Sequence, residues 1–125
     1  MGTTNTFDVE AIVRAYAETM LWQAVDYDEE GNEIIVSEEF DIDDIPQKIW
    51  DGIRQDVVDF IQAAAEDLQG LSEEAIGHNL VLTRNGHGAG FWDMELGARG
   101  ERLTKIANRL GEHQIFVIDG ELVDY

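Results

Sequence analysis

The sequence predicts an α+β fold in which two long N-terminal helices and one C-terminal helix pack on a small antiparallel sheet. The first 70 residues contain two stretches whose apolar side chains recur at helical spacing. Residues 78–125 also contain short apolar runs next to glycine-containing turns, which is typical of strands and hairpins. A chain of 125 residues fits one domain, 1–125, whose first part, 1–77, is mainly helical.

The first helix is expected over about residues 7–25. Its apolar residues follow a single stripe from Val9 to Ala24, and Thr6 can cap its N-terminus. Trp22 points away from this stripe. Its side chain therefore either packs under a neighbouring element or is an exposed contact aromatic.

The second helix is expected over residues 46–69, with Asp44 as its cap and Gly70 as its stop. Its apolar residues gather on one side and its acids on the opposite side, so the apolar side is expected to be core. A third helix is expected over about residues 96–110.

The predicted sheet consists of residues 79–84, 90–94 and 114–124. The run over 79–84 is rich in branched residues, and a short helix from Ser72 is expected to end before it, near Gly77. The residues after the glycine-rich turn are expected to be extended. Asp-Gly at 119–120 is a strong signal for a two-residue hairpin turn.

The charge is strongly negative and unevenly distributed. The chain has 27 acids and 8 bases, a net charge of −19. Residues 1–77 contain 20 acids and 3 bases, whereas 78–125, which are near-neutral, contain 7 acids and 5 bases. The densest stretch, 26–44, has 10 acids and no base; it reads as a polar loop followed by a short β run over 33–36. Such a field repels nucleic acid and anionic membranes, and it predicts a basic partner.

The predicted partner-binding surface consists of the acids of residues 26–44 and those on the outer face of the second helix. Carboxylates presented at every helical turn can occupy a basic groove in place of phosphates. The residues are Asp26, Asp28, Glu29, Glu30, Glu33, Glu38, Glu39, Asp41, Asp43, Asp44, Asp51, Asp56, Asp59, Glu66 and Asp67. No apolar run reaches the roughly 18 residues of a membrane span, so no membrane contact is expected.

Three patterns approach known ligand or catalytic motifs, and each falls short. Asp26, Asp28 and Glu30 match the start of a calcium loop, but Ser37 stands where a bidentate glutamate is needed. The glycine-rich turn over 85–90 lacks the lysine and hydroxyl residues of a phosphate loop. The chain has no cysteine, and its histidines lack metal-ligand spacing. The sequence therefore predicts no catalytic residue, no metal and no cofactor.

The glycine-rich turn is nonetheless constrained, because Asn85, His87, Trp92 and Asp93 lie close together along it. It is either a structural motif or a binding or catalytic loop. His113 follows a predicted helix stop and is expected to be exposed.

The segment LTRNGHGAGFWD, Leu82–Asp93, together with glycines at 97 and 100, resembles a group of small phage and mobile-element proteins of hypothetical function. The likeness covers about residues 78–123 and leaves out the acidic half. Where these proteins often have a basic residue after the aspartate, this chain has Met94. The resemblance implies a phage or prophage origin, and it implies no activity and no catalytic residues.

In charge and size the chain is also similar to phage-encoded DNA mimics. The predicted function is therefore a non-enzymatic inhibitor of a host nucleic-acid-binding protein, such as a defence nuclease, a repair enzyme or a transcription factor, in the cytoplasm of an infected or lysogenic bacterium. One alternative is a structural or assembly protein of a mobile element with a solubilising acidic face. Another is a small hydrolase or nucleotide-binding protein that uses His87 and Asp93.

Two electrostatic expectations concern the folded chain. Arg102, Lys105 and Arg109 share one side of the third helix and are expected to meet acids from residues 26–74, within the chain or across a homodimer interface. Crowding of like charges is expected to raise carboxylate pKa values in the folded state.

Overall fold

The computed structural model describes residues 7–86 and 90–124 and contains, within these ranges, five α-helices and two antiparallel two-stranded sheets. The mixed α and β class is thus confirmed. The helices are α1 (Val9–Gln23), α2 (Val36–Glu39), α3 (Gln47–Ala64), α4 (Glu73–Asn85) and α5 (Ala98–Asn108). Strand β1 (Val25–Tyr27) pairs with β2 (Glu33–Ile35), and β3 (Ile115–Ile118) pairs with β4 (Glu121–Asp124). Two short 3-10 helices are η1 (Ile42–Asp44) and η2 (Phe91–Asp93).

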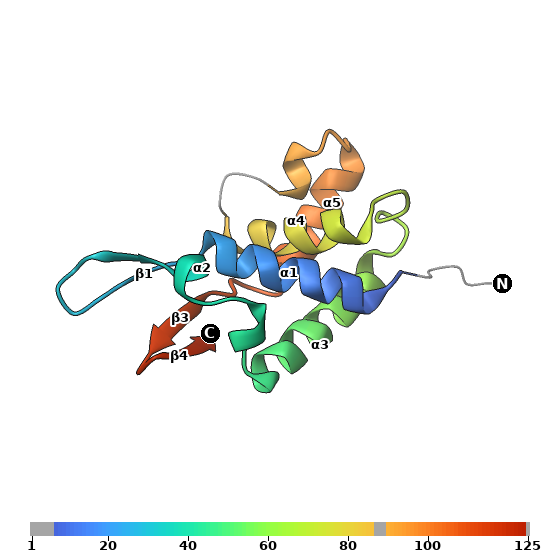
Figure 1. Cartoon of the computed structure of the whole chain (residues 1–125). Helices are drawn as coiled ribbons and strands as arrows, with labels where there is room; N and C mark the ends of the chain where they lie inside the picture. The colour runs from blue at the N-terminus through green and yellow to red at the C-terminus, as the bar shows by residue number, and fades with distance from the viewer. Residues whose placement is uncertain (1–6, 87–89, 125) are drawn as a thin grey trace.

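Helix α1 lies at the centre of the molecule and packs against both α4 and α3 (Figure 1). Its N-cap is Asp8, whose carboxylate accepts a hydrogen bond from the Ala11 backbone at 3.2 Å. The predicted cap, Thr6, lies outside the described residues. Tyr16 and Met20 of the predicted apolar stripe are fully buried, so the stripe is confirmed as core.

Helix α3 confirms the predicted amphipathic helix but is shorter than expected. It ends at Ala64, and a series of turns leads from there to Gly70. Asp44 does not cap it, because its carboxylate instead accepts a hydrogen bond from the Asp41 backbone at 2.9 Å within η1. The residue before the helix is Pro46, which has no side-chain acceptor.

The predicted strand over 79–84 is wrong, because these residues form the second half of α4. The Ser72 hydroxyl caps this helix by accepting a hydrogen bond from Ala75, and Gly86 ends it at a φ of 65°. Residues 80–84 are all buried. A helical turn that is buried on all sides lacks the 3.6-residue alternation of apolar and polar positions, so its pattern could not be separated from that of a buried strand.

The prediction that a helix ends near Gly77 is wrong. Gly77 lies inside α4 and allows this helix to lie directly against α1. A Cβ atom at this position would stand 2.8 Å from the Tyr16 nitrogen and 2.9 Å from the Ala15 Cβ, and it would also clash with the Ile12 carbonyl. The two backbones therefore approach each other at a distance that only glycine permits.

The expected extended segment over 90–94 is also wrong, since residues 91–93 form η2. Phe91 is fully buried and its ring stacks on Phe60 of α3, with 5.5 Å between the centroids. Its backbone N–H donates to the Thr83 hydroxyl at 3.1 Å. These contacts fix the segment between α4 and α5 and leave no strand there.

The C-terminal hairpin is confirmed. Asp119 and Gly120 have φ values of 53° and 79°, which is the left-handed pair that a tight two-residue turn requires. The predicted single sheet does not form, because the strands pair only as two separate hairpins within the described residues. Helix α5 agrees with the third predicted helix and buries Leu103 and Ala107.

Replacing Gly77 with alanine is expected to lower the free energy of unfolding by about 1–3 kcal/mol, because the added Cβ forces α1 and α4 apart. Urea denaturation measures this loss. The matched control is Gly52→Ala in α3, where an added Cβ meets nothing within 4 Å. That change should instead raise stability by roughly 0.5–1 kcal/mol. Equal stability of the two variants would contradict the close α1–α4 contact.

Candidate functional site

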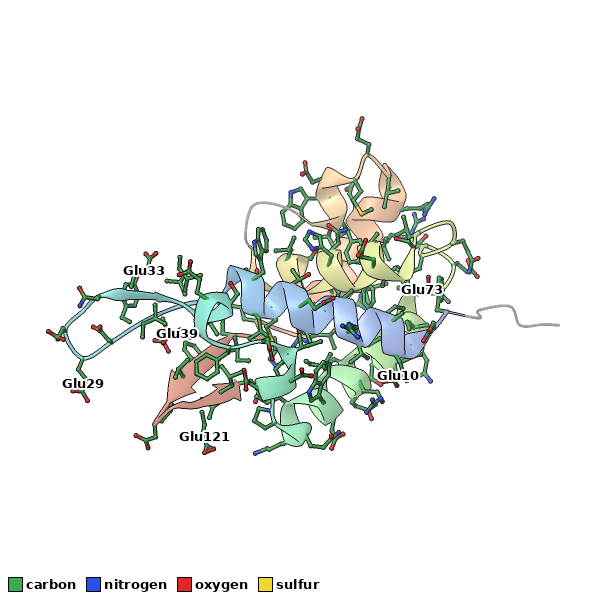
Figure 2. All side chains as sticks on the ribbon, in the orientation of Figure 1. Glu10, Glu29, Glu33, Glu39, Glu73 and Glu121 are labelled. Atoms are coloured by element: carbon green, nitrogen blue, oxygen red, sulfur yellow. The ribbon has the colours of Figure 1, made fainter. Side chains whose placement is uncertain are left out.

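Residues 26–44, called here the acidic segment, form most of the β1–β2 hairpin, then α2 and η1. The hairpin extends from the end of α1 on the side of the molecule where β3 and β4 lie (Figure 1). Figure 2 shows Glu29 and Glu33 on this hairpin, Glu39 nearer the helices and Glu121 on β4. One end of the molecule thus carries carboxylates from both hairpins.

The acidic segment is attached to the rest of the fold through its two ends and its middle. The Asp26 carboxylate accepts a hydrogen bond from the Val117 backbone in β3 at 2.9 Å. The Val36 backbone donates to the Ala24 carbonyl at 3.3 Å, and both Val36 and Ile45 are buried. Asp26 therefore serves as an internal link and is less available to a partner than predicted.

Asp28 organises the turn between β1 and β2. Its carboxylate accepts hydrogen bonds from the backbones of Asn32 at 2.8 Å and Glu30 at 2.9 Å. These bonds, that of Asn32 first, hold the pKa of Asp28 below its ordinary value. The residues that match a calcium loop thus form a hairpin turn, and the described ranges contain no group of three or more acids or histidines that could hold a metal ion.

The negative charge of the acidic segment is not matched by any base in the part of the chain that the structure describes. Apart from Asp26, all its acids are exposed. The arginines form their ion pairs with acids outside the segment: Arg14 with Glu18, Arg54 with Glu10 and Asp51, Arg84 with Asp56, and Arg102 with Asp67. The segment is therefore a surface of uncompensated charge.

The predicted surface acids outside the acidic segment, which lie in α3 and directly after it, differ in their exposure. Asp51, Asp59 and Glu66 are exposed, as predicted. Asp56 and Asp67 are not free on the outer face, since only 30% and 17% of their side chains is exposed and each is bound to an arginine. The helical pattern of one segment predicts which side chains face outward, but it cannot show an arginine that another helix supplies. Asp56 and Asp67 therefore do not belong to the exposed acidic surface.

A buried arginine, which the sequence analysis did not identify, holds Asp56. The side chain of Arg84 is 4% exposed and donates to the Asp56 carboxylate and to the Tyr16 hydroxyl, both at 2.8 Å. It also donates to the carbonyls of Leu110 at 3.0 Å and Gly111 at 2.7 Å. Its position two residues after the end of the apolar run 80–82 is the signal that could have marked it as a buried charge.

His113 continues this network, and the expectation that it is exposed is wrong. It is 5% exposed; its Nδ1 lies 2.6 Å from the Tyr16 hydroxyl and its Nε2 lies 2.7 Å from the Asp124 carboxylate. A guanidinium only donates and a carboxylate only accepts. With a neutral imidazole, Tyr16 therefore donates to His113, and His113 donates to Asp124. Burial raises the pKa of the Tyr16 hydroxyl, which keeps this donor protonated.

The three predicted loop residues that the structure describes, Asn85, Trp92 and Asp93, form no common site. The Asn85 side chain accepts a hydrogen bond from the His113 backbone at 2.7 Å and donates to the His113 carbonyl at 2.9 Å, which is a structural role. Trp92 and Asp93 are exposed on η2, and His87 lies outside the described residues. The described part of the loop therefore favours the structural interpretation of this motif.

The basic stripe of α5 meets the predicted acids at one position. Arg102 donates to both carboxylate oxygens of Asp67, at 2.9 and 2.7 Å. Lys105 and Arg109 are exposed and form no ion pair with any residue that the structure describes. The prediction is thus confirmed for Arg102 and not for its two neighbours.

Among the described residues, four carboxylates have pKa values below their ordinary values. Arg54 lowers the pKa of Glu10, Arg102 lowers that of Asp67, and the Asp8 backbone N–H lowers that of Glu73. Asp28 is the fourth. The expectation that crowding raises carboxylate pKa values is wrong for these residues, because hydrogen bonds outweigh the raising effect of desolvation at each of them.

Replacing Arg84 with glutamine is expected to lower the free energy of unfolding by about 3–5 kcal/mol, because it removes a buried guanidinium whose hydrogen bonds join Tyr16, the partly buried Asp56 carboxylate and two carbonyls. Denaturation with urea at neutral pH measures the loss. The control is Arg54→Gln, which breaks an exposed ion pair and should cost much less. Similar losses in the two variants would show that the buried network does not stabilise the fold.

The stabilising effect of the Arg102–Asp67 pair is expected to disappear in acid. The pKa of Asp67 is lowered in the folded state, so the unfolded chain binds the proton more tightly. The stabilisation is therefore fully present above the unfolded pKa, about 4, and is lost as the pH falls through the folded value. The difference in unfolding free energy between the wild type and Arg102→Gln should therefore be largest near neutral pH and shrink steadily as the pH falls below about 4. The control, Lys105→Gln, should show no such change. A difference for Arg102→Gln that stays constant with pH would contradict the assignment.

Within the described ranges, no helix has the length and apolar character needed to cross a membrane. Comparison of the chain with protein-family models, with curated proteins and with solved structures finds no match. The resemblance of Leu82–Asp93 to proteins of phages and mobile elements therefore stays a prediction.

Proposed function

We propose that this protein is an acidic inhibitor that binds the nucleic-acid-binding groove of a basic host protein, in the manner of a DNA mimic. The observation that carries the proposal is the acidic segment, whose 10 acids have no paired base among the described residues. A groove that binds nucleic acid places Lys and Arg side chains where phosphates lie. Carboxylates in those places make the same kind of charge-assisted hydrogen bonds.

The hairpin favours binding because its shape is fixed before a partner arrives. The Asp28 carboxylate closes the turn, and Val25 and Tyr27 pair in register with Ile35 and Glu33. A preformed surface loses less conformational entropy on binding than a loop that must become ordered. The charges of the hairpin thus act together on one partner.

One face of the hairpin also offers apolar contact. Val25, Tyr27 and Ile35 are exposed by 45%, 63% and 38% and lie on the same face, since Val25 pairs with Ile35. Exposed aromatic residues among polar ones are typical of positions that contribute most to protein binding. This face would contact apolar parts of the partner's groove while the carboxylates meet its bases.

The partners that fit are proteins with a basic groove, such as a defence nuclease, a repair enzyme or a transcription factor. With the phage or prophage origin that the sequence resemblance suggests, the site of action would be the cytoplasm of a bacterial host. Nothing in this proposal requires a catalytic residue of the chain itself.

The test is recovery of bacterial proteins on the immobilised protein, followed by elution with duplex DNA. The proposal expects nucleic-acid-binding proteins in the DNA eluate, and a dissociation constant for a purified partner that rises steeply with salt. A variant that replaces Glu29, Glu30, Glu38 and Glu39 with glutamine is expected to bind that partner about tenfold more weakly or worse.

The matched control removes four exposed acids from the near-neutral half of the chain: Asp93→Asn with Glu95→Gln, Glu101→Gln and Glu112→Gln. It changes the net charge by the same amount and should leave binding nearly unchanged. Equal weakening by both variants would show that only net charge matters. Binding that salt and DNA do not affect would contradict the proposal.

A further inference from the structure

A groove of about 560 Å³ lies between α1 and α4, outside the acidic segment. Its side chains come from both helices and include Glu18, Thr19 and Trp22 of α1 and Glu74, His78 and Asn79 of α4. Trp22 is 65% exposed. Of the two expectations for this side chain, burial under a neighbouring element is therefore wrong and exposure is right. No contact within the described fold explains why a large apolar ring stays in solvent here.

The polar groups of the groove have defined roles. Thr19 donates its only hydroxyl hydrogen to the Ala15 carbonyl at 2.8 Å. The contact of 3.0 Å between Thr19 Oγ1 and His78 Nδ1 therefore requires the imidazole to donate, and Nε2 of the neutral ring keeps its lone pair. The Trp22 ring lies beside this imidazole, with 6.3 Å between the centroids and 35° between the planes.

The remaining groups add acceptors. The Asn79 amide donates to the Ala75 carbonyl at 2.8 Å, which leaves its oxygen available. Glu74 is exposed and forms no ion pair within the described residues, and Glu18 lies 3.8 Å from an exposed Arg14, which is a weak pair. The groove thus combines an exposed indole ring with two carboxylates and further lone pairs.

We propose that this groove binds a guanidinium group, namely an arginine side chain in a basic segment of a protein partner. A guanidinium is planar and can stack on the face of an indole, and its N–H groups only donate, which matches a site whose free groups are acceptors. The carboxylates of Glu18 and Glu74 supply the opposite charge.

An anion does not fit the same groove. Although the N-terminus of α4 lies at one end, the Ser72 hydroxyl already accepts the N–H of Ala75 there. The charged side chains that line the groove are both acids, so a phosphate or carboxylate would be repelled.

This inference deepens the proposed function, because it names a residue type by which the partner would be recognised. It can nevertheless be tested without the partner. The probe is acetyl-Gly-Arg-Gly-amide, added to the full-length ¹⁵N-labelled protein and followed by ¹H–¹⁵N spectra. The comparison probe has citrulline, which is neutral and of nearly the same shape, in place of arginine.

The expected result is a change in the signals of the Trp22 indole N–H and of neighbouring α1 and α4 amides, with Trp22→Phe identifying the indole signal. The citrulline peptide should bind about tenfold more weakly or not at all, because it loses the charge. Equal binding of the two peptides, or signal changes confined to the β1–β2 hairpin, would overturn the inference.

Paired variants test the site itself. Glu18→Gln with Glu74→Gln is expected to weaken arginine-peptide binding about tenfold. The matched control, Glu29→Gln with Glu30→Gln, removes the same charge from the hairpin and should leave peptide affinity unchanged. An equal loss of peptide affinity in both double variants would show that the peptide is attracted only by the net negative charge, and it would overturn the inference.

The two proposals can fail separately. If the peptide binds the groove but the acidic segment does not affect binding of a purified partner, the inference stands and the proposed function fails. If the acidic segment governs partner binding but the peptide does not bind, the proposed function stands and the groove is not an arginine site.

Discussion

A buried guanidinium, that of Arg84, joins most of this fold. From the last turn of α4 it bonds to Tyr16 in α1, to Asp56 in α3 and to two carbonyls after the end of α5. A charge at this depth is tolerated only when its donors are used, because an unpaired buried charge costs several kcal/mol. Three helices and the segment that follows α5 therefore cannot shift relative to one another without breaking one of these bonds.

The exposed acidic surface depends on this buried network through a short series of contacts. Tyr16 contacts His113, and His113 contacts Asp124 in β4, which pairs with β3. Strand β3 in turn supplies the Val117 N–H that binds Asp26 at the base of the β1–β2 hairpin. The position of the uncompensated charge is thus set by buried and partly buried contacts, while Glu29 and Glu30 at the hairpin tip stay exposed.

The sequence predicted the elements whose pattern is local. Helices α1, α3 and α5 each have one apolar side, and the turn at 119–120 has a direct residue signature, so all four were recognised. Helix α4 was missed because its second half, residues 80–84, is buried on all sides and because Gly77 lies in its interior. At the site, the exposed acids followed from composition, but His113 did not, since its partner Tyr16 is 97 residues away. Pairing between distant elements leaves no local trace.

The separation of charge within the fold also gives the molecule an electric dipole. Its negative end is the β1–β2 hairpin, whereas α5, which carries the exposed Lys105, lies on another side of the molecule (Figure 1). In the field of a basic surface a dipole experiences a torque, so the protein would turn its hairpin forward before any contact forms. Rotation during approach reduces the number of unproductive encounters, and the rate of association then depends on where the charges lie as well as on how many there are.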